Sequence, residues 1–472
     1  MITLRPLSID RFPAATVIAL VTALAANVVI ARLIAQGRTD LLLYLAGGAA
    51  FGLSFLFWRQ AVYAVFAVLF VEGYIRNLLN TPDVLLLKDL MLAAIYIRVL
   101  ADRVHGRSGL IPASPINVPL AAFAAIVLAQ TFNPNVTAVG QAVVGVRTWL
   151  FYVPLYFVAR EMFPTERELR RFVWFVVLCA VPISLFAFRQ YFAGPEAYAS
   201  LGQGFEKAVF VTGGAGGSIF RPNATFAWST NFALFLALAT FLCVGLLLAS
   251  KGRARDLLWV LLAGLIATNI IENQRFVLVL LPPLALLIVA LRRSASAALI
   301  GGLAGVLGVI VVAQVASPDA FERITGLLQN QDRLFNVRAG TYLNHFTNAL
   351  ASPIGFGTGA TSLGARHVVG VIPLFVEFSL AKVVADLSVV GLALYLWLFV
   401  ALLQSTLRSH RDAARNGLRS LASLTAGVFA FQLLIAFVGY DLAIAAVPFW
   451  FLSGAIGGVT QRAIGAMEPQ RG

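Results

Sequence analysis

Long apolar stretches separated by short polar segments recur along the whole chain. Crossing about 30 Å of hydrocarbon takes a helix of roughly 17 to 25 residues. Backbone groups inside a bilayer must be hydrogen-bonded within the chain, so helices are the expected form. The pattern therefore predicts an all-α, polytopic membrane helix bundle of about 14 transmembrane helices. The predicted spans are 14–35, 41–57, 60–75, 84–101, 116–132, 143–160, 171–190, 227–249, 256–271, 276–292, 297–315, 375–403, 419–439 and 443–461.

Two connecting segments are much longer than the others, namely 191–226 and 316–374. The first is rich in glycine. The second is expected to be partly helical, over 320–329 and 334–350, and then to reach Pro353 and a run of glycines. Long connections are often functional. Both segments are predicted to leave the membrane on the same face.

Composition supports a membrane protein, because 60% of the residues are hydrophobic and only 12% are charged. The mean hydropathy is +0.87. A soluble domain carries about 25% charged residues. No repeat of fixed period and no soluble domain can be identified, so residues 1–472 are predicted to form a single transmembrane domain. Cys179 and Cys243 lie in apolar stretches without a CxxC spacing, so no disulfide, metal site or cofactor is predicted.

The net charge of +14 also fits a nucleic-acid-binding protein. Most of the basic residues, however, are arginines in short loops between the apolar stretches. The positive-inside rule explains this distribution better, so no nucleic-acid partner is expected. A majority of the basic residues falls in alternate loops on one side, which predicts a cytoplasmic location for that side and for both termini. The two long loops are then periplasmic.

Several arginines lie on the other side, against the sorting rule: Arg147, Arg221, Arg275, Arg333 and Arg338. The planar guanidinium group matches phosphate oxygens in a two-pronged contact. A convergent set of arginines at the outer leaflet indicates a site for a lipid-linked phosphate or pyrophosphate. The alternative for each arginine is a side chain that snorkels to the interface or a salt bridge to a neighbouring acid.

Five acids stand in apolar surroundings: Glu72, Asp89, Glu377, Asp386 and Asp441. Glu377 is the one that enters a span directly from the second long loop. A carboxylate beside arginines can serve as a general base. The alternative is a structural carboxylate that pairs with Lys382 or with an arginine of the loop.

The four histidines divide into two pairs. His345 and His367 lie in the second long loop and are candidate bases or substrate contacts. The alternative for both is an ordinary surface position. His105 and His410 are predicted to lie in cytoplasmic loops and to be solvated.

Several segments resemble a known family when taken in order. The stretch RAGTYLNHFTNALASPIGFGTG, which begins at Arg338, is similar to a pattern of the bacterial O-antigen ligase and O-antigen or exopolysaccharide polymerase superfamily. In that family an arginine precedes a helix that ends in a PlfGvG-like turn. Earlier segments that fit are GVRTWLFYVPLYFVAR around Arg147, FRPNATFAWSTNFALFLAL around Arg221 and NQRF around Arg275. Glu377, Asp386, Ser388, Gly391 and Leu392 follow where the family has its span after the turn.

This resemblance implies metal-independent transfer of saccharides from undecaprenyl pyrophosphate at the periplasmic face of the bacterial inner membrane. Carried over by position, Arg275 and Arg338 hold the donor pyrophosphate, with Arg147 and Arg221 as further members. Glu377 stands where ligases have the residue that activates the acceptor.

The expected function is therefore a polymerase of lipid-linked repeat units, whose donor and acceptor are undecaprenyl-pyrophosphate-linked oligosaccharides. A chain-length regulator and a flippase are candidate partners. The alternatives are an O-antigen ligase or protein O-oligosaccharyltransferase, and a flippase or secondary transporter. A transporter is expected to show structural repeats and interrupted helices at the midplane.

Overall fold

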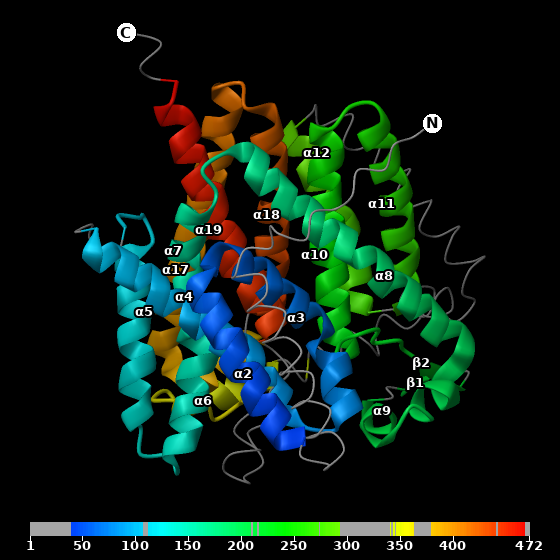
Figure 1. The fold of residues 1–472 in the computed structure, drawn as a ribbon. Coiled ribbons are helices and arrows are strands. Elements are labelled where there is room, and N and C mark those ends of the chain that lie inside the picture. The colour runs from blue at the N-terminus through cyan, green and yellow to red at the C-terminus, as the bar shows by residue number, and fades with distance from the viewer. Residues whose placement is uncertain are drawn as a thin grey trace, which may run out of the picture.

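The chain folds into a bundle of helices with one short hairpin of strands (Figure 1). This computed structural model describes residues 39–106, 112–208, 211–214, 217–272, 274–292, 340, 343–344, 346–362, 379–439 and 442–467. Its helices are α2 (Thr39–Leu56), α3 (Trp58–Leu79), α4 (Leu85–His105), α5 (Asn117–Ala129), α6 (Val139–Leu150), α7 (Pro154–Met162), α8 (Glu166–Ala199), α9 (Gln203–Ala208), α10 (Ser229–Ala249), α11 (Arg253–Glu272), α12 (Arg275–Arg292), α17 (Ser379–Arg415), α18 (Arg419–Val438) and α19 (Ala443–Gly465), with 3-10 turns η2 (Pro82–Val84) and η3 (Gln130–Phe132). The strands β1 (Val211–Gly214) and β2 (Gly217–Phe220) pair antiparallel.

The helices are those of a membrane protein. Within the described ranges, eight are long and apolar enough to cross a bilayer, with α6 and α7 counted together as Val139–Met162. Twelve of the predicted spans overlap described helices, but four of these helices are not among the eight, namely α2, α4, α5 and α12. The predicted spans 14–35 and 297–315 lie outside the described residues.

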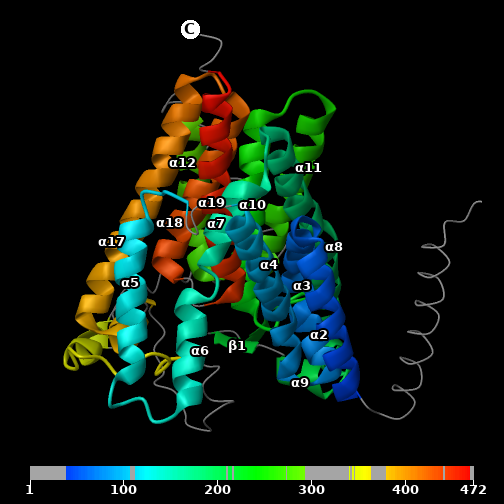
Figure 2. The same ribbon diagram turned by 60° about the vertical axis from the view of Figure 1, so that its left-hand side comes forward.

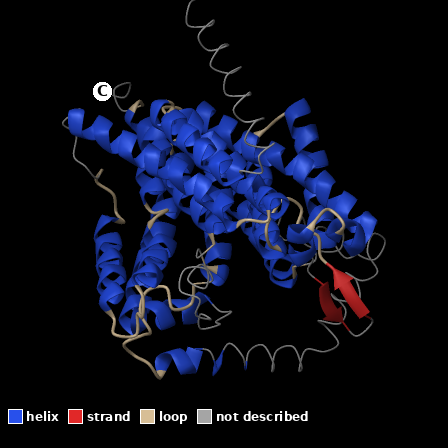
Figure 3. Cartoon of the chain, turned by 60° about the horizontal axis from the view of Figure 1, so that its bottom comes forward, coloured by secondary structure: helices blue, strands red, loops and turns tan. Residues whose placement is uncertain are grey.

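The ends of the bundle are distinguished by the connections they carry. The α7–α8, α10–α11 and α17–α18 connections lie at the upper end in Figure 1, whereas the α5–α6 connection, α9 and the hairpin lie at the lower end. Seen from below, the two strands form the margin of an otherwise helical molecule (Figure 3). We use "upper end" and "lower end" in this sense.

The core is built around α10 and α19. In the apolar stretches of these helices 89% and 94% of the residues are buried, against 39% in α3 and α11. A helix that is apolar on every side belongs at the centre when its neighbours surround it. Helix α10 packs against α18 and α11, and α19 packs against α7. Phe66 joins α3 to α8 and α19 through edge-to-face contacts with Phe172 and Phe451, and these two rings also contact each other.

Two helices extend well beyond the predicted spans. Helix α8 was expected to end at 190, yet it continues to Ala199 with a break at Gly194, whose φ is +81°. Pro195 starts the following turns, where its missing N–H has no consequence. Likewise α17 does not end at 403 but runs to Arg415, because the polar segment after the membrane stretch keeps its helical hydrogen bonds.

This extension of α17 also corrects the prediction for His410. The residue is 5% exposed and its Nδ1 lies 2.9 Å from the carbonyl oxygen of Ala422 on α18. It belongs to a helix pair and is not a solvated loop residue. His105, by contrast, is exposed as expected.

Helices α7 and α19 approach closely because α19 presents glycine to α7. A Cβ atom at Gly454 would clash with the carbonyl oxygen of Tyr156, and one at Gly458 would clash with that of Arg160. Small residues spaced four apart let membrane helices pack at backbone distance.

We expect Gly458→Val to lower the stability of the bundle by about 1 to 3 kcal/mol or more, because overpacking at a backbone contact forces the helices apart. Thermal unfolding in detergent measures this loss. Gly264→Val is the matched control, since a Cβ there meets nothing within 4 Å. A Gly458→Val protein as stable as the control would show that α7 and α19 do not pack in this way.

Candidate functional site

A glycine-rich segment at the lower end is held between α5, α6 and α17. We call residues 353–362 the glycine turn; it lies next to the lower ends of α5 and α6 (Figure 2). Gly355, Gly357 and Gly359 all have φ between +78° and +88°, which is a backbone conformation that only glycine adopts without strain. The sequence motif PIGFGTG thus encodes a compact turn.

The lower end of α5 and the 3-10 turn η3 that follows it hold the glycine turn. Gln130 Nε2 donates to the carbonyl oxygen of Ile354 at 3.0 Å, and Thr358 Oγ1 donates to the carbonyl of Val127 at 2.9 Å. On the other side, the Phe356 N–H donates to the carbonyl oxygen of Ala385 on α17 at 2.6 Å. The backbone of the turn is therefore satisfied by two helices that are distant in sequence.

Asp386 links the glycine turn to α6. Its carboxylate is 1% exposed and accepts from the Trp149 indole N–H at 3.1 Å and from the Thr361 N–H at 2.8 Å. Two residues later Ser388 adopts φ +76°, a left-handed conformation that is costly for a residue other than glycine. The resulting kink in α17 lies against Gly355 of the turn.

The opposite face of α6 carries Arg147. Arg147 Nε lies 2.7 Å from Asp89 Oδ2, and Nη2 lies 2.6 Å from the same oxygen. Tyr152 completes the group, because its hydroxyl donates to Asp89 Oδ1 at 3.1 Å. The Arg147 side chain is 35% exposed, and its Nη1 donates to no described residue. One edge of the guanidinium is therefore open to a ligand.

A second ion pair adjoins the first. Lys88 Nζ lies 2.8 Å from Glu72 Oε2, and the Lys88 side chain is 2% exposed. Because Lys88 and Asp89 are neighbours in α4, the two pairs form one charged network, comprising Glu72, Lys88, Asp89, Arg147 and Tyr152. Its formal charges cancel, which is how charged groups within a membrane bundle are normally tolerated.

Arg221 is placed differently from Arg147. Its side chain is 9% exposed, and Nη2 lies 2.6 Å from Glu272 Oε1, at the end of α11. It also hydrogen-bonds to the Gln274 side chain, while the Gln274 N–H donates to Glu272 Oε2 at 2.9 Å. Arg221 therefore holds the short connection that leads into α12 at Arg275.

Helix α3 lies between the two arginine groups. Residue 72 belongs to the charged network, and two residues later the Tyr74 N–H donates to the carbonyl oxygen of Thr225 at 2.7 Å. Thr225 belongs to the buried segment 221–226 that follows β2. The same turn of α3 thus contacts both groups.

Polar side chains are buried together in the same region. The side chains of Asn223, Asn77 and Gln190 surround the Tyr198 hydroxyl and interact with it. Gln190 also makes two bonds with the backbone of Ala224, of 2.8 and 3.0 Å. Buried polar groups cost free energy unless they are hydrogen-bonded, so this cluster fixes the segment 221–226 against α8.

Only part of the predicted site falls on described residues. Arg147 and Arg221 are both ion-paired, as the salt-bridge alternative predicted. Arg275 begins α12, but its side chain is outside the described part. The remaining candidates lie outside it altogether: Arg333, Arg338, His345, His367, Glu377 and the acid Asp441.

Sequence reasoning named the buried acids but missed their partners Lys88, Tyr152 and Trp149. The dipeptide KD inside LLLKDLML indicated such partners, because two charges in an apolar stretch cost free energy unless each forms an ion pair or a hydrogen bond. No comparable signal marked Trp149, which reads as an ordinary apolar residue. No group of three or more metal-ligating side chains occurs among the described residues.

Comparison with known proteins assigns the chain to no family. No protein-family model matches the chain, and no curated protein sequence matches it.

Proposed function

We propose that the chain is a membrane glycosyltransferase that polymerises undecaprenyl-pyrophosphate-linked oligosaccharide repeat units at the lower end of the bundle. One observation carries the proposal. Segments that resemble the O-antigen ligase and polymerase superfamily, although far apart in sequence, contact each other: α6 meets the glycine turn and Asp386, and the segment 221–226 meets the connection before Arg275. If these segments form one site, they should occur in the family's order along the chain and lie close together in the fold.

The proposed chemistry is an inverting attack on the anomeric carbon. A base removes the proton of the acceptor hydroxyl, the new glycosidic bond forms, and the pyrophosphate leaves with its bonding electrons. Cationic donors stabilise the charge that develops on the leaving group. We assign this role to Arg275 and Arg338, and that of the base to Glu377, with His345 and His367 as the alternatives.

Arg147 and Arg221 enter the proposal in different ways. Arg147 has an open guanidinium edge and is assigned to contact the donor, with Asp89 fixing its orientation. Arg221 is buried, so we assign it to hold the connection that carries Arg275. Arg333 is retained as a further donor contact from the second long loop.

The test is a reconstituted reaction. We expect the purified chain in vesicles to convert a lipid-pyrophosphate-linked oligosaccharide into longer lipid-linked glycans in the presence of EDTA, with release of the lipid pyrophosphate. Arg275→Lys and Arg338→Lys should each lower the rate about 100-fold, because lysine keeps the charge but loses the two-pronged contact. Mass spectrometry of the lipid-linked products gives the rate.

Arg292→Ala, at the other end of α12, is the control and should react at nearly the parental rate. Equal loss at all three positions would identify these residues as folding arginines. Transfer to lipid A core or to a protein acceptor in place of a second lipid-linked unit would identify a ligase or protein oligosaccharyltransferase. Movement of the intact lipid-linked sugar across the vesicle without transfer would identify a flippase.

A further inference from the structure

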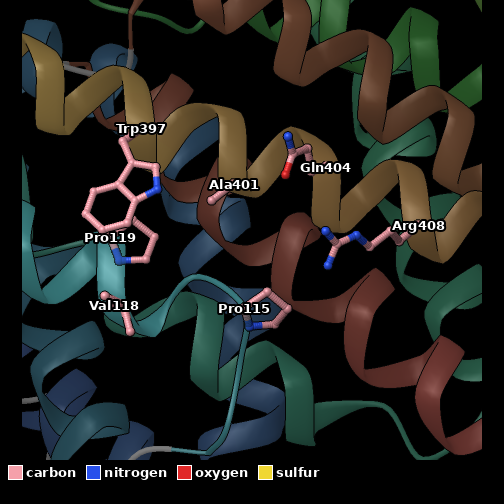
Figure 4. A pocket seen from close by; sticks show the side chains of 7 residues that line it. All are labelled: Pro115, Val118, Pro119, Trp397, Ala401, Gln404 and Arg408. Atoms are coloured by element: carbon pink, nitrogen blue, oxygen red, sulfur yellow. The ribbon is translucent and has the colours of Figure 1, made fainter.

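A groove opens between α5 and α17 in the upper half of the bundle. Below it the two helices touch, with the rings of Phe123 and Tyr395 centred 5.9 Å apart. Above this contact they separate and leave a cavity of about 240 Å³ (Figure 4). Its walls are Pro115, Val118 and Pro119 on one side and Trp397, Ala401, Gln404 and Arg408 on the other.

The lining residues of α17 belong to one face of the helix. They are spaced by four, three and four residues, which is the helical repeat that stacks side chains in a row. The row passes from Trp397 through the small Ala401 to the polar Gln404 and the cationic Arg408. The groove is therefore apolar at its deep end and polar at its upper end.

The position of Arg408 matches the membrane interface. No charged residue occurs over 389–407, and at 1.5 Å per residue this stretch is about 28 Å long, close to the thickness of the hydrocarbon core. Arg408 is the first charge beyond it. Trp397 then lies about 16 Å deeper along the helix, in the hydrocarbon. The groove thus leads from headgroup level into the acyl-chain region.

Arg408 is free to bind an anion. It is exposed and forms no ion pair with any residue that the structure describes, although Asp412 stands one turn away on the same helix. A guanidinium at headgroup level binds phosphate oxygens in a two-pronged contact. Gln404 is also exposed and offers an amide one turn below.

We propose that this groove binds one anionic glycerophospholipid of the leaflet at the upper end, with its phosphate on Arg408 and Gln404 and an acyl chain along Ala401 to Trp397. The apolar depth fits a single chain, and the cation at the mouth favours a negatively charged headgroup over a zwitterionic one. Basic pockets beside transmembrane helices select lipids in this way. The site lies apart from the residues assigned to glycosyl transfer and does not depend on that function.

Quenching of Trp397 tests the site. The full chain and its Trp397→Phe variant are reconstituted in phosphatidylcholine vesicles with rising fractions of dibrominated phosphatidylglycerol or dibrominated phosphatidylcholine. The difference between the two proteins isolates the fluorescence of Trp397. We expect half-maximal quenching at an about fivefold lower fraction of phosphatidylglycerol, which corresponds to about 1 kcal/mol for one arginine.

Arg408→Gln should abolish this preference, whereas Arg411→Gln, an exposed arginine outside the groove, should retain it. Ala401→Leu should weaken the quenching by both lipids, because the larger side chain fills the path of the acyl chain. Equal quenching by the two lipids in the parental protein would overturn the proposal. So would a preference that survives Arg408→Gln or an unchanged response of Ala401→Leu.

Discussion

Replacing Arg221 by leucine is expected to destabilise the folded bundle by about 3 to 5 kcal/mol, because it removes the buried cation of a buried ion pair. The Glu272 side chain is 1% exposed and lies 2.6 Å from Arg221. Water cannot take over the lost partner at that depth. Thermal unfolding in detergent, followed by size-exclusion chromatography, measures the change.

A double variant separates folding from function at this pair. Arg221→Leu combined with Glu272→Leu removes both charges and should recover much of the lost stability, since buried ion pairs are often replaceable by apolar residues. If Arg221 only holds the connection before Arg275, the folded double variant keeps measurable transfer. If it contacts the donor, the double variant folds but does not react.

The surface pair Arg98 and Asp102 provides the matched control. It joins residues four apart on α4 at 3.1 Å, with side chains 37% and 50% exposed. Arg98→Leu should cost at most about 1 kcal/mol, because exposed pairs are screened by water. A loss at Arg221 no larger than at Arg98 would contradict the assignment of Arg221 as a buried structural cation.

Replacing Glu377 by glutamine is expected to lower transfer by about 10² to 10⁴-fold, because a neutral amide cannot accept the proton of the acceptor hydroxyl. The sequence predicts that this residue enters a span from the second long loop, where the resemblance places the activating residue. The shape of the side chain is kept, so insertion and thermal stability should be unchanged. The measurement is the rate of glycan extension in the reconstituted system.

Glu377→Asp should retain part of the activity, since a carboxylate remains within reach of the acceptor. A Glu377→Gln protein that polymerises at the parental rate would instead make Glu377 a structural partner of Lys382. The role of base would then pass to His345 or His367, and alanine at each of these positions would identify which one.

The helical membrane architecture was predictable from the sequence, because a transmembrane helix requires a long apolar stretch. The predicted stretch 227–249, for example, coincides with α10 to within two residues at either end. Helix ends were less predictable, as α17 illustrates. Hydropathy marks where the hydrocarbon ends, whereas the helix continues for as long as its backbone hydrogen bonds do.

The site was predictable in its residue types but not in its pairings. Glu72, Asp89 and Asp386 stood out because an acid in an apolar stretch needs a partner. Which partner each acid finds depends on the rotation and contact of helices that are distant in sequence. Thus Glu272 pairs with Arg221, which lies 51 residues earlier in the chain.

The close packing of α7 on α19 also sets the order in which the molecule can be completed. Helix α7 leaves the ribosome about 280 residues before α19, which is roughly 14 to 56 s at 5 to 20 residues per second. Its inner face includes Arg160, whose final partners are Gln461 and the glycine surface of α19. During synthesis that face is without its neighbour. Helix α19 therefore closes this part of the core, and α7 acquires its native packing only after α19 has been made.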